Sequence, residues 1–351
     1  MASTPEKPAT LSWTPPTPRS RVGITLETYI LDGMMGSPAA TGTFTSVLNT
    51  LSLGAKLITA HVRRAGLANL LGLTGQTNIQ GEQVAKLDEE ANEILLTVFG
   101  SRHHCAAVAT EEMEQIVAFP KHDKGKYLVV FDPLDGSSNI DCNASIGTIF
   151  GVLRKAGDQA ATEGDFFQKG RDLVAAGYVL YGSSTMLVIT TGKSGVHGFT
   201  YDPTVGEFLL SHENIRTPQK GNTYSINEGN ASRWTDDVTR WNQWIKGEDK
   251  ESGRPYGQRY IGTLVADAHR TLLKGGVFAY PADKKSPTGK LRLLYEANPF
   301  AFILEAAGGK ASTGRERILD IQPTALHQRV PLVLGSYEDV DAYEQFMRGE
   351  R

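Results

Sequence analysis

Two carboxylates directly follow an apolar run, and this is where the chain most clearly carries groups that could do chemistry. Residues 127–131 are mostly β-prone, which predicts a strand buried on both faces. Because Pro133 cannot donate a hydrogen bond to a sheet, we expect the strand to end there. Asp132 and Asp135 would then lie at the carboxyl end of a strand, where open α/β sheets bind their ligands.

The turn after these acids is made of small residues. Gly136 permits a tight turn, and Ser137, Ser138 and Asn139 add hydroxyl, amide and backbone N–H groups. Carboxylates beside such a turn suit a hard cation on one side and a phosphate on the other. The alternative is an acidic turn that only closes a strand, since these residue types are common turn formers.

Further acids occupy positions where an uncompensated charge is costly. A second apolar run, residues 105–110, ends in Glu111 and Glu112. Apolar residues also recur at helical spacing over 82–98, and Asp88 falls on their face. A buried carboxylate needs a partner, which is either a metal site or, for an acid at a helix edge, a neighbouring lysine.

Converging acids require a cation, because two carboxylates about 4 Å apart repel by roughly 4 kcal/mol at an effective dielectric constant of 20. Oxygen ligands select Mg²⁺ or Mn²⁺, and two such ions make a phosphoryl-transfer site. The acids that we expect to meet are Asp88, Glu111, Glu112, Asp132 and Asp135, with Glu82 and Glu296 as further candidates.

A second cluster is basic and aromatic: Arg259, Tyr260, Tyr280, Lys290 and Arg292. In a strand, Lys290 and Arg292 share one face, and two cations on one face suit a phosphate. A solvated basic strand face is the alternative. Acids and a separate cationic pocket together indicate a substrate with two phosphates, one cleaved and one held.

Composition limits the classes of protein that remain. The chain has 351 residues, 40% of them hydrophobic, which fits one or two globular domains. A net charge of −3 argues against nucleic-acid binding, and no apolar run reaches transmembrane length. Two cysteines argue against a disulfide framework. We therefore expect a cytoplasmic protein. The last three residues are not a peroxisomal targeting signal, so a peroxisome-like organelle is an alternative only if such a signal is missing from the sequence.

Helical and strand patterns interleave, which predicts an α/β fold with large mixed sheets. Residues 1–20 form a Pro-, Ser- and Thr-rich flexible tail, residues 66–81 a loop, and residues 196–208 a hairpin. Helices are expected over 43–65, 82–98, 236–246, 262–274, 299–307 and 337–347, and strands over 105–110, 149–153, 173–180, 186–191, 291–294 and 330–335.

Two motifs carry a family resemblance. Residues 132–139, DPLDGSSN, resemble the signature of the lithium-sensitive, metal-dependent sugar and inositol phosphatases. Residues 285–299, KSPTGKLRLLYEANP, are similar to the hallmark of class I fructose-1,6-bisphosphatases. The likeness runs from about residue 41 to the C-terminus. It implies a layered αβαβα sandwich, with an AMP-type allosteric and metal-site domain over 21–214 and a sugar-bisphosphate domain over 215–351.

The resemblance also implies the activity. The chain would hydrolyse the 1-phosphate of fructose 1,6-bisphosphate in gluconeogenesis, as a homotetramer holding two or more Mg²⁺ or Mn²⁺ ions per subunit. The alternatives are a relative that acts on sedoheptulose 1,7-bisphosphate and a non-catalytic regulator that binds sugar phosphate or nucleotide.

The implied roles fall on particular residues. Asp88 and Glu112 would orient or deprotonate the attacking water, and the metal ligands would be Glu82, Glu111, Glu112, Asp132, the Leu134 carbonyl, Asp135 and Glu296. Substrate would meet Gly136, Ser137, Ser138, Asn227, Tyr260, Tyr280, Lys290, Arg292 and, from a neighbouring subunit, Arg259. AMP, as an inhibitor, would meet Thr41, Gly42, Thr43, Phe44, Thr45, Lys126, Tyr127 and Arg154.

Three positions depart from the family pattern. Glu82 stands where the family usually has Asp, Asn230 where it has a Tyr that touches the 6-phosphate, and Thr43 where it has an acid. We expect the longer side chain of Glu82 to place its carboxylate differently. We expect Asn230 to alter the affinity for the 6-phosphate and Thr43 to alter the affinity for AMP.

Overall fold

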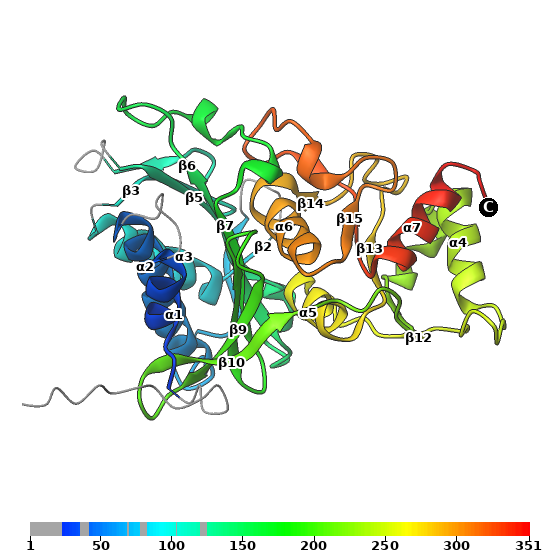
Figure 1. Ribbon diagram of the computed structural model, residues 1–351, viewed down its shortest axis with the longest axis horizontal. Coiled ribbons are helices and arrows are strands. Elements are labelled where there is room, and N and C mark those ends of the chain that lie inside the picture. Colours follow the sequence, from blue (N-terminus) through cyan, green and yellow to red (C-terminus); the bar gives the residue numbers. More distant parts are fainter. Residues whose placement is uncertain (1–22, 36–41, 69, 78–82, 103, 120–124) are drawn as a thin grey trace, which may run out of the picture.

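The computed structural model describes residues 23–35, 42–68, 70–77, 83–102, 104–119 and 125–351. The expected tail, Thr41 and Glu82 lie outside these residues. Helices and sheets alternate in five layers, which run across the molecule in Figure 1. The predicted αβαβα arrangement with two large mixed sheets is therefore confirmed. None of the described helices is long and apolar enough to cross a lipid bilayer.

The first sheet has eight strands in the order β10-β9-β8-β7-β6-β5-β3-β4. β3 and β5 are parallel, and their neighbours pair antiparallel. The strands are β3 (Cys105–Thr110), β4 (Val117–Ala118), β5 (Tyr127–Asp135), β6 (Ile146–Arg154), β7 (Ala175–Tyr181), β8 (Thr185–Thr190), β9 (Val196–Asp202) and β10 (Glu207–Ile215). Helices α1 (Leu26–Met35), α2 (Gly42–Val62) and α3 (Lys86–Gly100) cover one face of this sheet (Figure 1).

The second sheet has five strands in the order β12-β11-β13-β17-β15. They are β11 (Thr223–Ser225), β12 (Gly257–Gln258), β13 (Val277–Tyr280), β15 (Lys310–Ser312) and β17 (Leu332–Gly335). Helices α5 (Leu264–Lys274) and α6 (Asn298–Ala306) lie between the two sheets, and α4 (Asp236–Lys246) and α7 (Tyr337–Met347) cover the outer face (Figure 1). Two small ribbons pair β1 (Leu73–Thr77) with β2 (Gln83–Ala85) and β14 (Leu291–Arg292) with β16 (Arg329–Val330).

Alternation along the strands explains the layering. In β5, Leu128 and Val130 pack against the middle helices, while Val129 and Phe131 pack against α2 and α3. Because successive side chains of a strand point to opposite faces, an apolar run such as β5 requires a cover on both sides.

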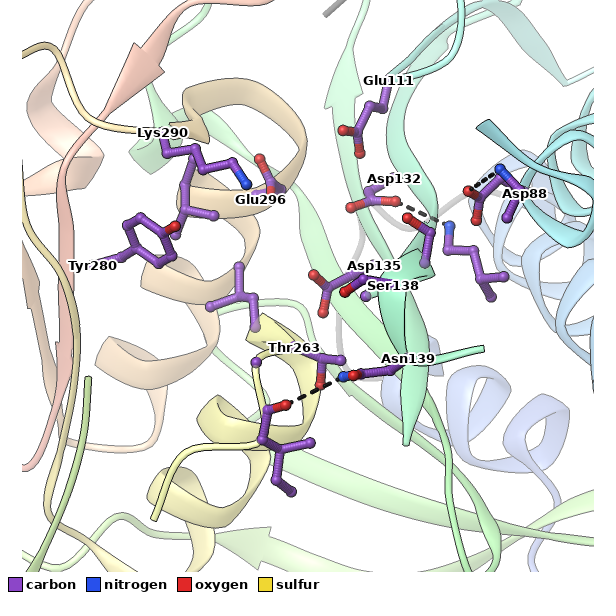
Figure 2. Close-up of a pocket in the computed structure, with 18 of the residues that line it drawn as sticks. Asp88, Glu111, Asp132, Asp135, Ser138, Asn139, Thr263, Tyr280, Lys290 and Glu296 are labelled. Atoms are coloured by element: carbon purple, nitrogen blue, oxygen red, sulfur yellow. Dashed lines mark hydrogen bonds between the residues drawn. The ribbon is translucent and has the colours of Figure 1, made fainter. Parts of the chain in front are cut away.

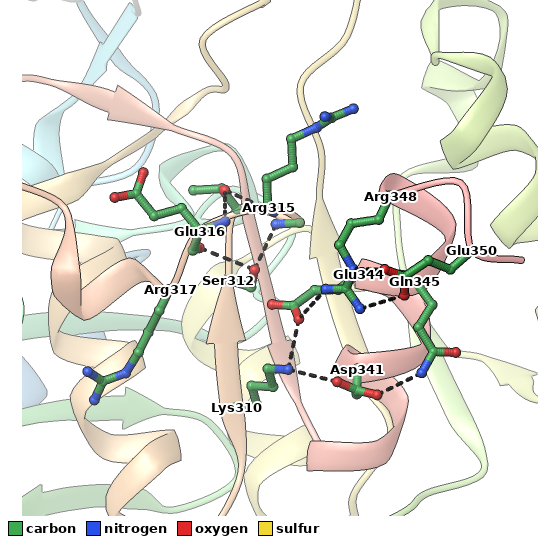
Figure 3. Close-up of polar contacts among 12 residues, drawn as sticks. Lys310, Ser312, Arg315, Glu316, Arg317, Asp341, Glu344, Gln345, Arg348 and Glu350 are labelled. Carbon is green, nitrogen blue, oxygen red and sulfur yellow. Dashed lines mark hydrogen bonds and ion pairs between the residues drawn. The ribbon is translucent and has the colours of Figure 1, made fainter.

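Charged side chains fasten the outermost helix to the second sheet. Lys310 on β15 lies 3.0 Å from the Asp341 carboxylate and 2.8 Å from that of Glu344, both on α7 (Figure 3). Arg348 reaches Glu344 at 3.4 Å and Glu350 at 2.7 Å. The network is partly exposed, so its members hold the orientation of α7 more than they stabilise the fold.

Several predicted element boundaries are wrong. β5 continues through Pro133 to Asp135, because Pro133 and Leu134 form a bulge that lies opposite the single residue Thr148. The ladder skips the bulged residues, so no N–H is needed from the proline, and the Thr148 hydroxyl donates to the Pro133 carbonyl at 2.8 Å.

Two helices begin later than their apolar patterns predicted. Residues 83–85 belong to β2, and α3 starts at Lys86, where the Asp88 carboxylate accepts the Ala85 N–H. α5 starts at Leu264, where the Thr263 hydroxyl accepts the Ala266 N–H. The predicted loop 66–81 contains β1, and the strand predicted over 291–294 ends at Arg292 and turns into a π-helical segment, Leu293–Ala297.

At Gly136, β5 comes into close contact with the start of α5, and a substitution there tests this contact. Its φ is +88°, and a Cβ added there would lie 2.1 Å from Cγ2 of Thr263. Backbone strain alone should lower the free energy of unfolding by about 1–2 kcal/mol. We expect Gly136→Ala to lower it further, and to lower the melting temperature by more than a substitution that causes strain without a close contact. Gly157→Ala, at φ +66° with nothing within 4 Å, is the strain-only control.

Adding Thr263→Ser to Gly136→Ala should restore part of the loss, since serine keeps the capping oxygen without Cγ2. Equal melting temperatures for Gly136→Ala and Gly157→Ala would contradict this account of the contact.

Candidate active site

Three acids from two parts of the chain converge in one cavity. Asp132 and Asp135 on β5 and Glu296 in the π-helical segment each offer an oxygen within 4.8 Å of the others. The cavity has a volume of about 740 Å³ and also contains Asp88, Glu111 and Glu112. In Figure 2, Glu111, Asp132 and Asp135 face Glu296 and Lys290 across it.

The bulge in β5 turns both aspartates toward the cavity. Residues three apart in a regular strand point to opposite faces, so Asp132 and Asp135 could not otherwise meet. The extra residue of the bulge removes this offset. The Leu134 N–H donates to Asp132 at 3.0 Å and fixes the turn. Leu134 itself lines the cavity.

The N-terminus of α5 holds Asp135. The Val265 N–H donates to Asp135 Oδ2 at 2.7 Å, and the Leu264 N–H also favours the charged form. Thr263 caps the helix, whose first turn points at the carboxylate. Free N–H groups and the helix dipole both stabilise an anion there.

Arg292 lies among the acids. Its guanidinium is 2.6 Å from Glu111 Oε1 and 3.9 Å from Glu296 Oε2, and the residue is buried. The sequence suggested that Lys290 and Arg292 share one face of a strand, but β14 begins at Leu291 and Lys290 precedes it. Lys290 lines the cavity beside Arg292. Arg292 thus compensates the acids directly.

Asp88 occupies the third position of α3 and is 4% exposed. Its Oδ2 accepts the Ala85 N–H at 3.3 Å, and Ser137 lies close enough to favour its charged form. Of the two partners expected for this carboxylate, the structure favours the acidic cavity, because Asp88 lines it together with Glu111 and Glu112.

Burial raises the pKa of these acids. Desolvation, with Glu112 next in importance, raises the pKa of Asp88 to about 8. Desolvation likewise raises the pKa of Asp135 to about 7 and of Glu296 to about 8, although backbone N–H groups and Arg292 respectively act against it. The pKa of Asp132 is raised well above its usual value by burial and by Glu111. The positive groups present do not neutralise the cluster.

The remaining expected substrate residues surround the acids. The turn Ser137–Asn139 is a 3₁₀ helix at the cavity wall, and Asn139 donates to the Ile261 carbonyl at 3.3 Å (Figure 2). Asn227, Tyr260, Tyr280 and Lys290 also line the cavity. Arg259 is exposed and lies instead in an adjoining pocket of about 700 Å³ that shares Asn227 and Tyr260.

Comparison with known proteins now identifies the family. Residues 24–213 match the family model described as Fructose-1-6-bisphosphatase, N-terminal domain, and residues 217–348 match that of the C-terminal domain. The chain belongs to the fructose-1,6-bisphosphatase family.

Individual relatives agree. The chain is 71% identical over 342 residues to a fructose-1,6-bisphosphatase class 1 of Sorangium cellulosum, a match that covers 97% of this chain and 98% of the relative. It is 55% identical to that of Chloroherpeton thalassium, over 93% of this chain and 94% of the relative. The holo crystal structure of Leishmania major fructose-1,6-bisphosphatase matches with a TM-score of 0.87 at 42% identity, covering 93% of this chain and 99% of that one.

The donor set of this fructose-1,6-bisphosphatase fits a hard divalent cation. Asp132, Asp135 and Glu296 offer only carboxylate oxygens, which suit Mg²⁺ and Mn²⁺. A cation would also relieve the repulsion that, after burial, helps to raise the pKa of these acids. Glu111, Glu112 and Leu134 line the same cavity.

The residues implied in AMP binding gather at the other end of β5. Tyr127 pairs with Arg154 across β5 and β6, and the Arg154 guanidinium lies 5.6 Å from the centre of the Tyr127 ring. Phe44, near the start of α2, also lies 5.6 Å from that ring. Gly42, Thr43 and Thr45 belong to the same first turn, and Lys126 is exposed beside Tyr127.

Two sets of supporting residues were missed by the sequence analysis. Thr263 and the first turn of α5 hold Asp135, and a Thr immediately before an apolar helical pattern was an available capping signal. Thr110 donates to Asn92 at 2.8 Å and joins α3, one turn beyond Asp88, to the strand that carries Glu111. That contact is between distant residues and had no local signal.

The raised pKa values make metal binding depend on pH. In the unfolded chain these acids titrate near pH 4, so the metal-free folded state binds more protons and loses stability as pH rises from about 4 to about 8. A cation must displace those protons. We expect Mg²⁺ to raise the melting temperature more at pH about 8.5 than at pH about 6.

Asp132→Asn should lose this Mg²⁺ effect. Asp339→Asn is the matched control, because Asp339 is also buried with a raised pKa but is bound to Tyr256 and the Gly221 N–H, outside the cavity. A Mg²⁺ effect that is independent of pH would refute the linkage.

Proposed function

We propose that this fructose-1,6-bisphosphatase hydrolyses the 1-phosphate of fructose 1,6-bisphosphate to fructose 6-phosphate and phosphate, a step of gluconeogenesis. The observation that carries the proposal is the convergence of Asp132, Asp135 and Glu296 in a cavity that Lys290 and two tyrosines also line. The names of the relatives at 71% and 55% identity support the same substrate.

Two or more Mg²⁺ or Mn²⁺ ions would be held by Glu111, Glu112, Asp132, the Leu134 carbonyl, Asp135 and Glu296, with Glu82 outside the described residues. Bound there, such ions activate water and stabilise the charge on the leaving oxygen. Asp88 and Glu112, which line the same cavity, would orient or deprotonate the attacking water, and Asp88 can accept a proton only once its own has been displaced by the cation. The backbone turn at Gly136–Ser138 would orient the phosphate that is cleaved.

The second phosphate would bind elsewhere in the same cavity. Asn227, Tyr260 and Tyr280 offer neutral donors there, and Lys290 supplies a positive charge near the sugar. Burial and the neighbouring Tyr280 raise the pKa of Tyr260 to about 12, so that its hydroxyl keeps its proton and can donate. The family resemblance implies that Arg259, which lines the adjoining pocket, would act on the same phosphate in a neighbouring subunit.

The activity is tested by phosphate release from fructose 1,6-bisphosphate with and without Mg²⁺. We expect Mg²⁺-dependent release, none from fructose 6-phosphate, and a loss of about 10³-fold in Asp132→Asn, because one carboxylate of the cluster is removed. Asp158→Asn, at an exposed carboxylate, is the control and should retain full activity.

Faster release from sedoheptulose 1,7-bisphosphate would replace the proposed substrate by the seven-carbon sugar. Binding of sugar bisphosphate without any release, with either metal, would leave only the role of a regulator.

We also propose that AMP inhibits the enzyme by binding at the start of α2. The grouping of Phe44, Tyr127 and Arg154, with Lys126 exposed beside them, supports a site for an aromatic base and a phosphate. Lys126→Ala should raise the AMP concentration for half inhibition by about tenfold, which corresponds to about 1.4 kcal/mol. The exposed Lys193→Ala is the charge-matched control. Full activity at millimolar AMP in the unmodified enzyme would refute this proposal.

Assembly and location are further proposals. The role that the resemblance implies for Arg259, in the site of a neighbouring subunit, requires an oligomer, and we propose the implied homotetramer. Sedimentation should give the mass of four chains, and a monomer with full activity would contradict it. We propose a cytoplasmic location on the grounds of composition and cysteine count, to be checked by cell fractionation.

A further inference from the structure

The turn after β3 carries Glu111 and Glu112 and then runs over the surface to residue 116. Few backbone bonds hold it to its own sheet: the Glu111 N–H donates to the Phe131 carbonyl at 3.2 Å, and the Met113 N–H reaches the Thr110 carbonyl at 3.4 Å. Met113 is 40% exposed. A turn of this kind positions two acids well only if another part of the chain fixes it.

His327 reaches this turn from the C-terminal half of the chain. Its Nε2 lies 3.4 Å from the Glu114 carbonyl oxygen, and its Nδ1 lies 2.8 Å from the hydroxyl of Tyr295. A carbonyl can only accept, so Nε2 carries the hydrogen, and the bare Nδ1 of a neutral ring accepts the Tyr295 O–H. Burial lowers the pKa of His327, which favours this neutral form.

Tyr295, at the other end of the bonds that His327 makes, belongs to a well-packed part of the chain. Tyr295 is fully buried in the π-helical segment and directly precedes Glu296. The Leu293 N–H donates to the Gln328 carbonyl at 2.7 Å, and this bond continues the pairing of β14 with β16. The backbone that follows His327 is therefore fixed to the backbone that precedes Glu296.

His327 thus spans two groups of acids that come from different parts of the chain. Arg292 binds the first residue of the turn, Glu111, at 2.6 Å, and His327 binds the turn at Glu114. Glu112 lies between these two attachments. The two ends of the turn are also held by Thr110 and by the pairing of β4 with β3. Without the bond to His327, the middle of the turn next to Glu112 loses its attachment to the C-terminal half of the chain.

We propose that His327 is a positioning residue for the metal site: with Tyr295 it sets the position of the Glu111–Glu112 turn relative to Glu296. The inference rests on the proposed function, because the acids are placed for a divalent cation. Partners that orient metal-binding groups typically contribute 10- to 100-fold to metal affinity. We expect about tenfold here, because His327 acts through the backbone of the turn.

Two substitutions test the two hydrogen bonds of the His327 ring one at a time. In His327→Gln, the amide nitrogen can replace Nε2 and keep the bond to Glu114. In His327→Asn, the amide oxygen can replace Nδ1 and keep the bond to Tyr295 but not that to the turn. If the attachment of the turn is what matters, Asn is the more damaging change.

The measurement is Mn²⁺ binding to the metal-free enzyme without substrate, followed by electron paramagnetic resonance. We expect the Mn²⁺ dissociation constant to rise about tenfold in His327→Asn and clearly less in His327→Gln. The Mg²⁺ concentration for half-maximal phosphate release should shift in parallel, while kcat at saturating Mg²⁺ changes little. If neither variant folds, Tyr295→Phe takes their place: it keeps the packing of the ring and the bond of His327 to the turn, so we expect a rise smaller than tenfold, and an unchanged dissociation constant would overturn the inference.

His197 provides the matched control. It is buried in the first sheet, where its Nε2 lies 2.8 Å from the Ser194 carbonyl and its Nδ1 accepts the Asn214 N–H at 3.1 Å. His197→Asn should lower the melting temperature and leave Mn²⁺ binding unchanged.

Unchanged Mn²⁺ binding in both His327 variants would overturn the inference, and so would an equal loss in both. Absence of Mn²⁺ binding in the unmodified enzyme would refute the proposed metal site itself, and the role of His327 with it.

Discussion

The burial of several carboxylates in one cavity is the constraint on which the rest of the structure depends. Asp132, Asp135 and Glu296 lie within reach of a single ion, and burial raises the pKa of each. Isolated buried charges are costly, so the chain surrounds them with compensating groups. Arg292 supplies a positive charge and the N-terminus of α5 a partial positive charge, but the pKa of each of these acids remains raised by burial. The remaining compensation has to come from a ligand.

The layered fold makes this arrangement possible. β5 in the first sheet supplies two of the acids, and the segment before α6, between the sheets, supplies Glu296. α5 lies in the same middle layer and places its first turn on Asp135. The cavity therefore exists only when both sheets pack on the middle helices. A protein built this way couples the formation of its site to the completion of its core.

Local patterns in the sequence predicted much of the fold, because apolar periodicity is a local property. The bounds of α4 and α7 match their predicted ranges, and the hairpin over 196–208 corresponds to β9 and the start of β10. The end of β5 was misplaced because the rule for proline holds for a regular ladder, whereas Thr148 from the next strand stabilises a bulge. The helix starts were misplaced because a capping side chain, not the apolar pattern, decides where a helix begins.

The site was only partly accessible from sequence. Acids at strand ends could be singled out, and the family resemblance implied which of them bind metal. The partner of Arg292 and the contact of His327 with the turn after β3 join residues far apart in the chain, and no spacing rule reaches them. Supporting contacts of this kind need the folded structure.

The most direct test of the central claim is anomalous diffraction from crystals of the enzyme grown with Mn²⁺. The account predicts Mn²⁺ peaks within bonding distance, about 2.0–2.2 Å, of oxygens of Asp132, Asp135 and Glu296, with a further ion near Glu111 and Glu112. Crystals that contain Mn²⁺ elsewhere, or none at all, with the carboxylates of this cavity unliganded, would contradict it.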